Sequence, residues 1–277
     1  MKSFREGLRE FGYVEGRNIR FEFRSAGGQS GNLSPLAAEL VGLKVDLIVA
    51  YQTPAATAAK QATKDIPIVM GTVGDPVGTG LVASLARPGG NITGVAGATA
   101  ELGAKNLDLI RDVLPSVRRV AVLANAPDPF SKPFLGHIQA AAKALNIETK
   151  PVMVRRAGEL GAEFAEIEKW QAQAVVVQPS LPHKQVAELA LKHRLPAFAP
   201  NAAFPSAGGL MSYSGDNDAQ FRKSAKFVDA ILKGRKPADL PVEMPTKFWL
   251  VVNLKTAKAI GITIPEAMLL RADQVIE

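Results

Sequence analysis

Hydrophobic positions along the chain follow two alternating spacings. Some stretches repeat apolar residues every three or four positions, as in Phe221, Ala225 and Val228, which is the spacing of one helix face. Others alternate apolar and polar residues, as in 18–24, or form short apolar runs such as 45–50, and both patterns are typical of strands. The predicted helices cover residues 2–12, 33–43, 54–63, 76–86, 101–114, 130–145, 158–170, 182–194, 221–234 and 253–261. The predicted strands cover residues 18–24, 45–50, 66–70, 92–95, 119–124, 147–154, 174–177, 196–199, 210–213 and 248–252.

The order of these elements predicts the fold class. Strands and helices alternate almost throughout, which is the pattern of α/β folds that have parallel sheets with helices on both faces. About ten strands fit two sheets of five better than one sheet, and 277 residues suit two domains of ordinary size. Residues 93–100 are all small, which suits a crossing segment that bends. We therefore expect two doubly wound parallel-sheet lobes joined by a hinge.

The charge distribution argues against nucleic-acid binding. The net charge is +7, but the basic residues are scattered, with no run of five or more and no interleaved aromatic residues. There are no cysteines, which excludes disulfides, thiolate metal sites and cysteine nucleophiles. The longest apolar runs are far too short to span a bilayer, so we expect no direct membrane insertion of the given chain. Met1 opens directly into a charged helical pattern, so the sequence displays no export signal.

Signals of catalysis are weak. The three histidines, His137, His183 and His193, have no metal-ligand spacing, and two of them lie in helical patterns where packing is the simpler explanation. No nucleophile elbow, phosphate loop or dinucleotide-binding glycine motif follows a predicted strand. We therefore expect no catalytic residue, no metal and no cofactor, in a protein that is not an enzyme.

Polar residues gather instead where the predicted strands end. In parallel α/β sheets, ligands bind beyond the carboxyl ends of the strands, where helix N-termini present free N–H groups. The strand-end residues are Ser25, Tyr51, Gln52, Thr53, Thr72, Gly74, Asp75, Asn125, Asp128, Gln178, Ser180, Asn201, Ser212, Tyr213 and Asp216. Helix capping is the alternative role, because Thr53, Ser180 and Asp216 are good N-cap residues and Asp75 is able to stabilise a helix start at Pro76. As a group they line the faces that two such lobes would turn toward each other.

Several longer segments carry a family resemblance. The most specific are 74–78, Gly-Asp-Pro-Val-Gly, and 81–94, Leu-Val-Ala-Ser-Leu-Ala-Arg-Pro-Gly-Gly-Asn-Ile-Thr-Gly. Further agreement lies at residues 11–19, 36–40, 53–56, 66–69, 208–213, 231–234, 237–241 and 253–258. Over nearly its whole length the chain resembles the ABC-transporter substrate-binding family that includes tryptophan- and tyrosine-binding lipoproteins.

The resemblance implies a periplasmic-binding-protein type I fold, in which three crossing strands hinge two lobes. Lobe 1 would take residues 1–96 and 214–242. Lobe 2 would take residues 97–213 and 243–277.

The resemblance also implies which residues contact a ligand. Thr53 and Asp75 would do so from lobe 1, and Asn125 and Ser180 from lobe 2. Asp75 is the expected partner of a ligand ammonium, and the helix starts at Thr53 and Ser180 are expected to bind a carboxylate. The full set of predicted ligand-binding residues is Tyr51, Gln52, Thr53, Asp75, Asn125, Asp128, Phe130, Ser180, Tyr213 and Asp216. Its aromatic members are wall candidates for an aromatic ligand.

Two features depart from the family pattern. Relatives carry a strand before the helix that begins at Lys2, and it would lie in the first sheet between residues 18–24 and 45–50. That first strand of lobe 1 is missing from the given sequence, which predicts lowered stability or replacement of the strand by a neighbouring chain. Tyr51 and Gln52 stand where relatives usually have smaller residues. The tyrosine is expected either to stack on an aromatic ligand or to fill space and select a smaller one.

The implied function is that of the solute-binding component of an ABC importer. Such a protein would bind a small carboxylate-bearing ligand, an aromatic amino acid or a related compound, between its lobes by hinge closure. Its partner would be the membrane permease, and its location would be periplasmic or otherwise extracytoplasmic, with the export signal absent from the given chain. Two alternatives stay open on the same two-lobed fold. A ligand-sensing regulator would need a DNA-binding segment, and a small-molecule enzyme would need a nucleophile or a cofactor loop.

Overall fold

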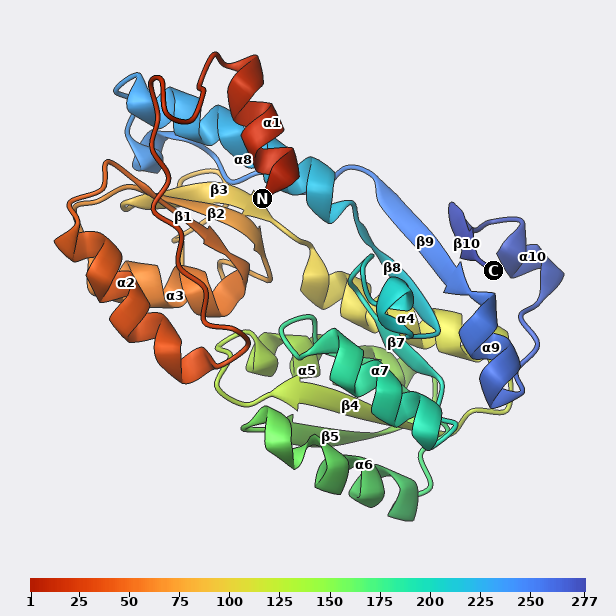
Figure 1. The fold of residues 1–277 in the computed structure, drawn as a ribbon. Helices are drawn as coiled ribbons and strands as arrows, with labels where there is room; N and C mark the ends of the chain where they lie inside the picture. The colour runs from red at the N-terminus through yellow and green to blue at the C-terminus, as the bar shows by residue number, and fades with distance from the viewer. The chain divides into compact units, whose positions relative to one another are not determined.

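The computed structural model describes all residues from 1 to 277, and the chain divides into two compact units. Unit 1 comprises Met1–Ala98 and Asp216–Thr246, and unit 2 comprises Thr99–Gly215 and Lys247–Glu277. The chain therefore passes from one unit to the other three times. Both units combine parallel strands with helices, which confirms the predicted α/β fold class (Figure 1). None of the helices is both long and apolar enough to cross a membrane.

Unit 1 is built on a three-stranded parallel sheet in the order β1-β2-β3. Its strands are β1 (Ile48–Tyr51), β2 (Ile68–Val73) and β3 (Ile92–Ala96). Its helices are α1 (Lys2–Glu10), α2 (Leu33–Gly42), α3 (Gln52–Ala62) and α8 (Asn217–Leu232), with short 3-10 turns at Ser30–Asn32 and Pro237–Asp239. Alternate residues of each strand face opposite sides of the sheet. One side packs against α2 and α3, and the other side packs against α1 and α8.

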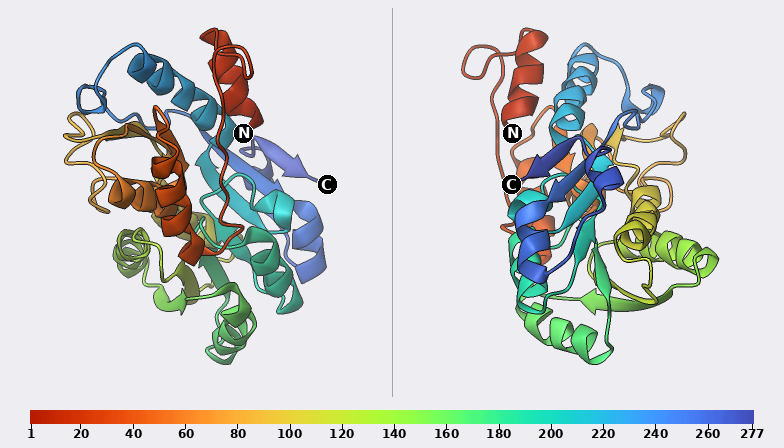
Figure 2. Two further views of the ribbon diagram at one scale, coloured as in Figure 1. Left: turned by 60° about the vertical axis from the view of Figure 1, so that its left-hand side comes forward. Right: turned by 90° about the vertical axis from the view of Figure 1, so that its right-hand side faces the viewer.

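Helix α1 is held against α8 by aromatic packing and by a close backbone approach. The rings of Phe4 and Phe221 stack with their centroids 5.0 Å apart, and Leu8 is fully buried beside them. A β-carbon on Gly7 would lie 2.6 Å from the carbonyl oxygen of Arg222, so this contact requires glycine. Figures 1 and 2 show α1 lying alongside α8 in each view.

Unit 2 is built on a seven-stranded sheet in the order β10-β9-β8-β7-β6-β4-β5. Its strands are β4 (Arg119–Asn125), β5 (Glu148–Val154), β6 (Ala174–Val177), β7 (Ala197–Ala199), β8 (Met211–Gly215), β9 (Phe248–Asn253) and β10 (Gln274–Ile276). Its helices are α4 (Thr99–Val113), α5 (Ser131–Ala144), α6 (Leu160–Lys169), α7 (His183–Lys192), α9 (Leu254–Ile260) and α10 (Glu266–Leu269), with 3-10 turns at Ala157–Glu159 and Pro205–Ala207. All pairs are parallel except β8 with β9.

Two hydrophobic clusters cover the two faces of the unit 2 sheet. On β4, Val120 and Val122 face the cluster that includes Phe134 of α5, while Ala121 and Leu123 face the cluster of α6 and α7. A strand that is buried on both faces reads as a continuous apolar run, and this is why the run at residues 120–124 predicts a strand without alternation. The helices thus lie on both faces, as the α/β pattern predicts.

The prediction of two five-stranded sheets is wrong, because the sheets have three and seven strands. Strands β8, β9 and β10 all extend the sheet of unit 2, and β10 and α10 were not predicted from the sequence at all. The predicted strand at 18–24 is also wrong. The segment makes only an isolated bridge between Glu15 and Ile19, and no strand lies between it and β1.

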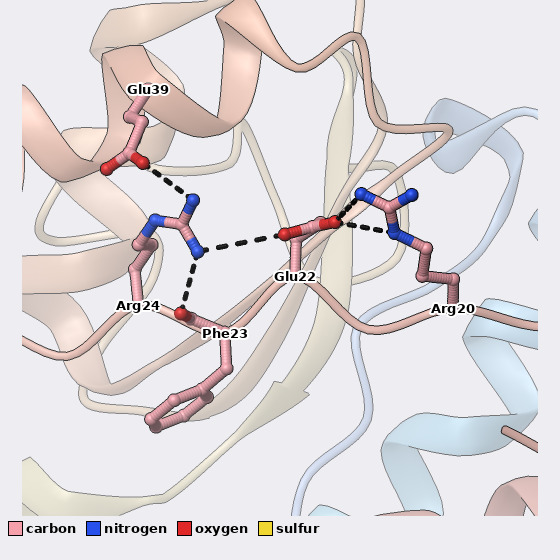
Figure 3. Close-up of polar contacts among 5 residues, drawn as sticks. All are labelled: Arg20, Glu22, Phe23, Arg24 and Glu39. Atoms are coloured by element: carbon pink, nitrogen blue, oxygen red, sulfur yellow. Dashed lines mark hydrogen bonds and ion pairs between the residues drawn. The ribbon is translucent and has the colours of Figure 1, made fainter. Parts of the chain in front are cut away.

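Side-chain contacts, rather than sheet hydrogen bonds, hold this irregular segment in place. Ile19 and Phe21 pack against the cluster of α1 and α8, and charged side chains link other residues of the segment (Figure 3). Arg24 donates to the Glu39 carboxylate of α2 at 2.6 Å and to the carbonyl oxygen of Phe23 at 2.9 Å. Glu22 lies between two guanidinium groups, 3.8 Å from that of Arg24 and in a hydrogen bond of 2.6 Å from Nε of Arg20. The alternation of apolar and charged residues at 19–24 therefore reflects an extended segment with one packed side, which finds no strand partner.

The predicted helix at 76–86 is wrong as well, since residues 76–80 form turns and no helix follows. Thr79 donates both its backbone N–H and its hydroxyl to the Asp75 carbonyl oxygen, at 3.0 and 2.8 Å. Lys60 of α3 then caps the carbonyl oxygens of Gly80 and Leu81 at 2.7 and 2.9 Å. These contacts order the loop without a helix.

Candidate functional site

In unit 2, the carboxyl ends of neighbouring parallel strands bring together three predicted site residues, Asn125, Asp128 and Ser180. Strand β4 ends at Asn125, and β6, which pairs with β4, ends at Val177 just before Gln178 and Ser180. Nδ2 of Asn125 donates to Oγ of Ser180 at 3.2 Å. The backbone N–H of Asn125 donates to Oε1 of the fully buried Gln178 at 2.9 Å. The strand ends are thus joined by side-chain hydrogen bonds.

Asp128 is the centre of this network. Its side chain is only 2% exposed and accepts three hydrogen bonds: from Oγ of Ser180 at 2.6 Å, from Nε2 of Gln178 at 2.8 Å and from the backbone N–H of Phe130 at 2.9 Å. Burial raises the pKa of the Asp128 carboxyl, although the three donors work in the opposite direction. A buried carboxylate that is satisfied by neutral donors alone is an unusual feature for a structural role.

Gln178 was among the strand-end residues of the sequence but was not predicted as a site residue. Its amide accepts from Asn125 on one side and donates to Asp128 on the other, so it fixes both. The buried glutamine directly after an apolar strand was the available signal, since a polar side chain that is fully buried must find partners.

Ser180 does not cap a helix, contrary to one of its two predicted roles. Helix α7 starts at His183, its N-cap residue is Pro182, and no side chain caps it. Helix α5 likewise has Phe130 as N-cap and no side-chain cap. Ser180 is half-buried, and its hydroxyl is part of the Asp128 network instead.

In unit 1, the predicted residues lie at the carboxyl ends of β1 and β2, which are neighbouring parallel strands. Thr53 is the second residue of α3 and not its cap, which corrects the prediction that it precedes the helix. Its buried hydroxyl accepts a hydrogen bond from the backbone N–H of Gly74 at 3.1 Å and thereby ties the start of α3 to the turn after β2. Tyr51 is the N-cap residue, and no side chain caps α3.

Asp75 folds back on its own turn, and the alternative that it stabilises a helix start at Pro76 is wrong, because no helix follows. Its Oδ1 accepts from the backbone N–H of Gly78 at 2.8 Å, and a β-carbon at position 78 would overlap the same carboxylate. The residue is half-buried. Asp75 therefore uses one oxygen in the turn and keeps capacity on the other.

The backbone of unit 1 is strained at these same strand ends. Gln52, Thr72 and Asp75 adopt positive φ angles of 66°, 53° and 34°. Such angles are uncommon for residues other than glycine and, for a β-branched residue such as threonine, a clear outlier. Strained residues persist where the surroundings enforce them, and they concentrate at ligand-binding sites. The sequence gives no signal for this strain, because none of the three is glycine.

The aromatic wall candidates differ in their surroundings. Tyr51 is 41% exposed, and its ring meets the edge of Phe221 with centroids 5.5 Å apart. Phe130 is 3% exposed and packs against Phe134 in the core of unit 2, with centroids 5.6 Å apart. Tyr213 of β8 is half-buried. Tyr51 is thus the most exposed residue among the aromatic candidates.

The remaining predicted residue, Asp216, caps α8. Its Oδ1 accepts from the backbone N–H groups of Asp218 and Ala219 at 2.9 and 3.0 Å. Tyr213 packs against Phe248, with ring centroids 5.9 Å apart. No group of three or more His, Asp or Glu side chains lies together in a way that would hold a metal ion.

Comparison with known proteins identifies the family of the chain. The chain matches the family described as ABC transporter substrate binding protein over residues 1–276. The tyrosine-binding protein of Clostridioides difficile (strain R20291) is 30% identical over 264 residues, which cover 94% of this chain and 75% of that protein.

Two solved structures are similar over nearly their whole length. The crystal structure of a conserved domain protein from Vibrio cholerae O1 biovar El Tor has a TM-score of 0.93 at 28% identity and covers 99% of this chain and 93% of that one. The crystal structure of an ABC domain in complex with L-Trp from Streptococcus pneumoniae has a TM-score of 0.91 at 29% identity, with the same 99% and 93% coverage. The resemblance predicted from the sequence is therefore confirmed, and the chain belongs to the ABC transporter substrate binding protein family, whose members are substrate-binding proteins and not enzymes.

Proposed function

We propose that this chain is the solute-binding component of an ABC importer and that it binds an aromatic amino acid or a related carboxylate-bearing compound. Two relatives that match over most of this chain support the ligand class, since one is named for tyrosine and another was solved with L-Trp. The permease of the importer would be its partner, and its location would be extracytoplasmic.

The observation that carries the proposal is the gathering of polar side chains at the carboxyl ends of parallel strands. In unit 2 Asn125, Asp128 and Ser180 form one hydrogen-bonded group, and in unit 1 Thr53 and Asp75 stand at the ends of β1 and β2. Ligands of open α/β sheets bind at this end of the strands. A ligand that binds at these strand ends would favour the state of the protein to which it binds best.

The carboxylate and the ring of an aromatic amino acid both have suitable partners in unit 1. The first turn of α3 has no side-chain cap, so its backbone N–H groups are able to bind a carboxylate. The half-open ring of Tyr51 offers a surface for stacking at the same strand end. A carboxylate, an ammonium and a ring together are able to supply the roughly 8 kcal/mol of a micromolar complex.

A thermal-shift panel tests the proposal. The panel contains amino acids, aromatic 2-oxo acids, aromatic carboxylates and sugars, each at saturating concentration. A ligand at 100-fold over its Kd adds about 2.7 kcal/mol to the free energy of unfolding, which for a chain of this size raises Tm by roughly 5–10 °C. A selective shift with an aromatic amino acid or a close analogue is expected. A Tm shift with sugars alone would contradict the proposal, and so would the absence of a shift with every compound of the panel.

A further inference from the structure

The buried carboxylate of Asp128 lacks a cation. All three of its hydrogen-bond donors are neutral, and no charged side chain contributes to its surroundings. None of the titratable residues on the two helices that follow strands β4 and β6 bonds to it; they are Lys132, His137 and the exposed Lys143 of α5, and His183, Lys184 and the exposed Glu188 and Lys192 of α7. Lys132, His137 and Lys184 are exposed, and burial lowers the pKa of His183, which keeps that ring neutral near pH 7.

When it is ionised, the Asp128 carboxylate dictates the direction of the hydrogen bonds around it. A carboxylate only accepts, so Ser180 must give its single hydroxyl proton to Asp128 over their 2.6 Å contact. The atom of Asn125 that faces the serine oxygen must then be a donor, which fixes Nδ2 there at 3.2 Å and turns Oδ1 away from the network. Gln178 cannot reverse this order, since its Oε1 already accepts from the backbone N–H of Asn125.

The outcome is a surface that accepts hydrogen bonds. Ser180 has no proton left for a ligand but keeps a lone pair, and Oδ1 of Asn125 accepts no hydrogen bond within the chain. The negative charge of Asp128 lies next to the serine hydroxyl, at 2.6 Å from its oxygen. Such a surface favours the N–H groups of a cationic amine and disfavours a carboxylate. This differs from the prediction that Ser180 meets the carboxylate of the ligand and Asp75 its ammonium.

We propose that Asp128 is a positioning residue that makes the Asn125–Ser180 surface selective for the cationic amine of the ligand. The inference rests on the proposed function, which it deepens by stating the amine as a requirement. Asp128 does not itself contact the amine, because it is buried behind Ser180, and it acts through the orientation of the serine hydroxyl and through its charge.

Calorimetric titrations with a matched set of ligands test the inference. The set is L-tryptophan, which carries both groups, 3-(indol-3-yl)propionate, which lacks the amine, and tryptamine, which lacks the carboxylate; the tyrosine series serves in the same way. The wild-type chain is expected to bind the amino acid about 10-fold or more tightly than the propionate, as befits a charge-assisted hydrogen bond. Asp128→Asn is expected to weaken tryptophan and tryptamine about 10-fold or more and to leave the propionate unchanged.

Two further variants separate selectivity from folding. Ser180→Ala removes the acceptor but not the carboxylate, and it is expected to show the same amine-specific loss. Asp273→Asn is the matched control, because Asp273 of unit 2 accepts a backbone N–H from Leu250 at 2.8 Å and has no contact with the network. It is expected to leave all three affinities unchanged. Equal losses for all ligands in Asp128→Asn would show a purely structural role and overturn the inference.

The pH profile of the wild-type chain provides a readout that needs no substitution. Burial raises the pKa of the Asp128 carboxyl, so its charge is lost as the pH falls through that raised pKa, whereas the ligand amine stays charged at neutral pH and below. The affinity for the amino acid relative to the propionate is therefore expected to rise with pH. A ratio that stays flat, together with an unchanged ratio in Asp128→Asn, would overturn the inference. Failure of the wild-type chain to bind any member of either series would instead contradict the proposed function, and the inference with it.

Discussion

The role of Thr53 as a tie between α3 and the turn after β2 is tested by a pair of identical substitutions one helical turn apart. In Thr53→Val the hydroxyl that accepts from Gly74 N–H is replaced by a methyl group, and the buried N–H loses its partner. In Thr57→Val, on the same face of α3, the hydroxyl removed is itself buried without a hydrogen-bond partner. Threonine and valine have the same shape and nearly the same helix propensity, so the pair isolates the hydrogen bond.

The two substitutions are expected to change the free energy of unfolding by amounts that differ in sign as well as in size. An unsatisfied buried donor costs about 1–3 kcal/mol, so Thr53→Val is expected to lower the free energy of unfolding by that amount. At about 2–4 °C per kcal/mol, Tm falls by roughly 2–12 °C. Thr57→Val removes a buried polar atom that has no partner, so it is expected to be neutral or to stabilise by up to about 1 kcal/mol.

Urea unfolding followed by circular dichroism, with ligand titrations on the folded variants, measures both effects. Thr53→Val is also expected to weaken ligand binding, because the turn that carries Asp75 loses its attachment to α3. Equal unfolding midpoints for the two variants, or a larger loss in Thr57→Val, would refute the account of this hydrogen bond.

Three further predictions concern stability. Asp216→Ala removes the N-cap of α8 and is expected to cost about 1 kcal/mol in urea unfolding, whereas Asp216→Ser retains most of the cap. Gly209→Ala would drive a β-carbon into the buried ring of Phe204 and is expected to cost about 1–3 kcal/mol, whereas Gly136→Ala, in an open position of α5, is expected to stabilise by about 0.5–1 kcal/mol. The hydrogen bond from Arg24 lowers the pKa of the Glu39 carboxyl. The stability that this pair contributes is therefore present above the pKa of Glu39 in the unfolded chain, and it is lost as the pH falls through the pKa of Glu39 in the folded chain. Glu39→Gln is therefore expected to make the urea midpoint less sensitive to pH below about 5, and an unchanged pH profile would contradict this.

Local signals in the sequence predicted elements well when the cause was local. Asn253 was predicted to cap a helix that ends at Gly261, and its Oδ1 does accept from the N–H of Thr256, three residues on, in a helix that ends one residue before that glycine. The strand at 174–177 was predicted with its observed bounds, because a short apolar run that is buried on both faces has few alternatives. Capping and burial are decided by residues close in the chain.

Elements that depend on distant partners were not predictable in the same way. The alternation at 18–24 indicates an extended segment with one packed side, but whether it pairs depends on a neighbouring strand elsewhere in the chain. The helix expected after Pro76 had a good start signal, yet the Asp75 side chain and carbonyl group close a tight turn with Gly78 and Thr79 instead. Choosing between these outcomes requires the tertiary structure.

The candidate site, too, could be predicted from the sequence only in part. The residue types at the strand ends could be read directly, and Asn125 and Ser180 do lie within one hydrogen bond of each other. The directions of those bonds could not be read, because they follow from the burial of Asp128 and from its link to Gln178. The positive φ angles of Gln52 and Thr72 were equally hidden, because neither residue type announces such a conformation.

The central claim is that this protein binds a small aromatic amino acid reversibly and does not change it. Isothermal titration calorimetry of the wild-type chain with L-tryptophan and L-tyrosine, followed by chromatographic recovery of the ligand, tests the claim most directly. The account predicts a single saturable site with a Kd of roughly micromolar or tighter, worth about 8 kcal/mol or more, and quantitative recovery of the unaltered amino acid. No saturable binding of any aromatic amino acid or analogue, or a ligand recovered as a different compound, would contradict it.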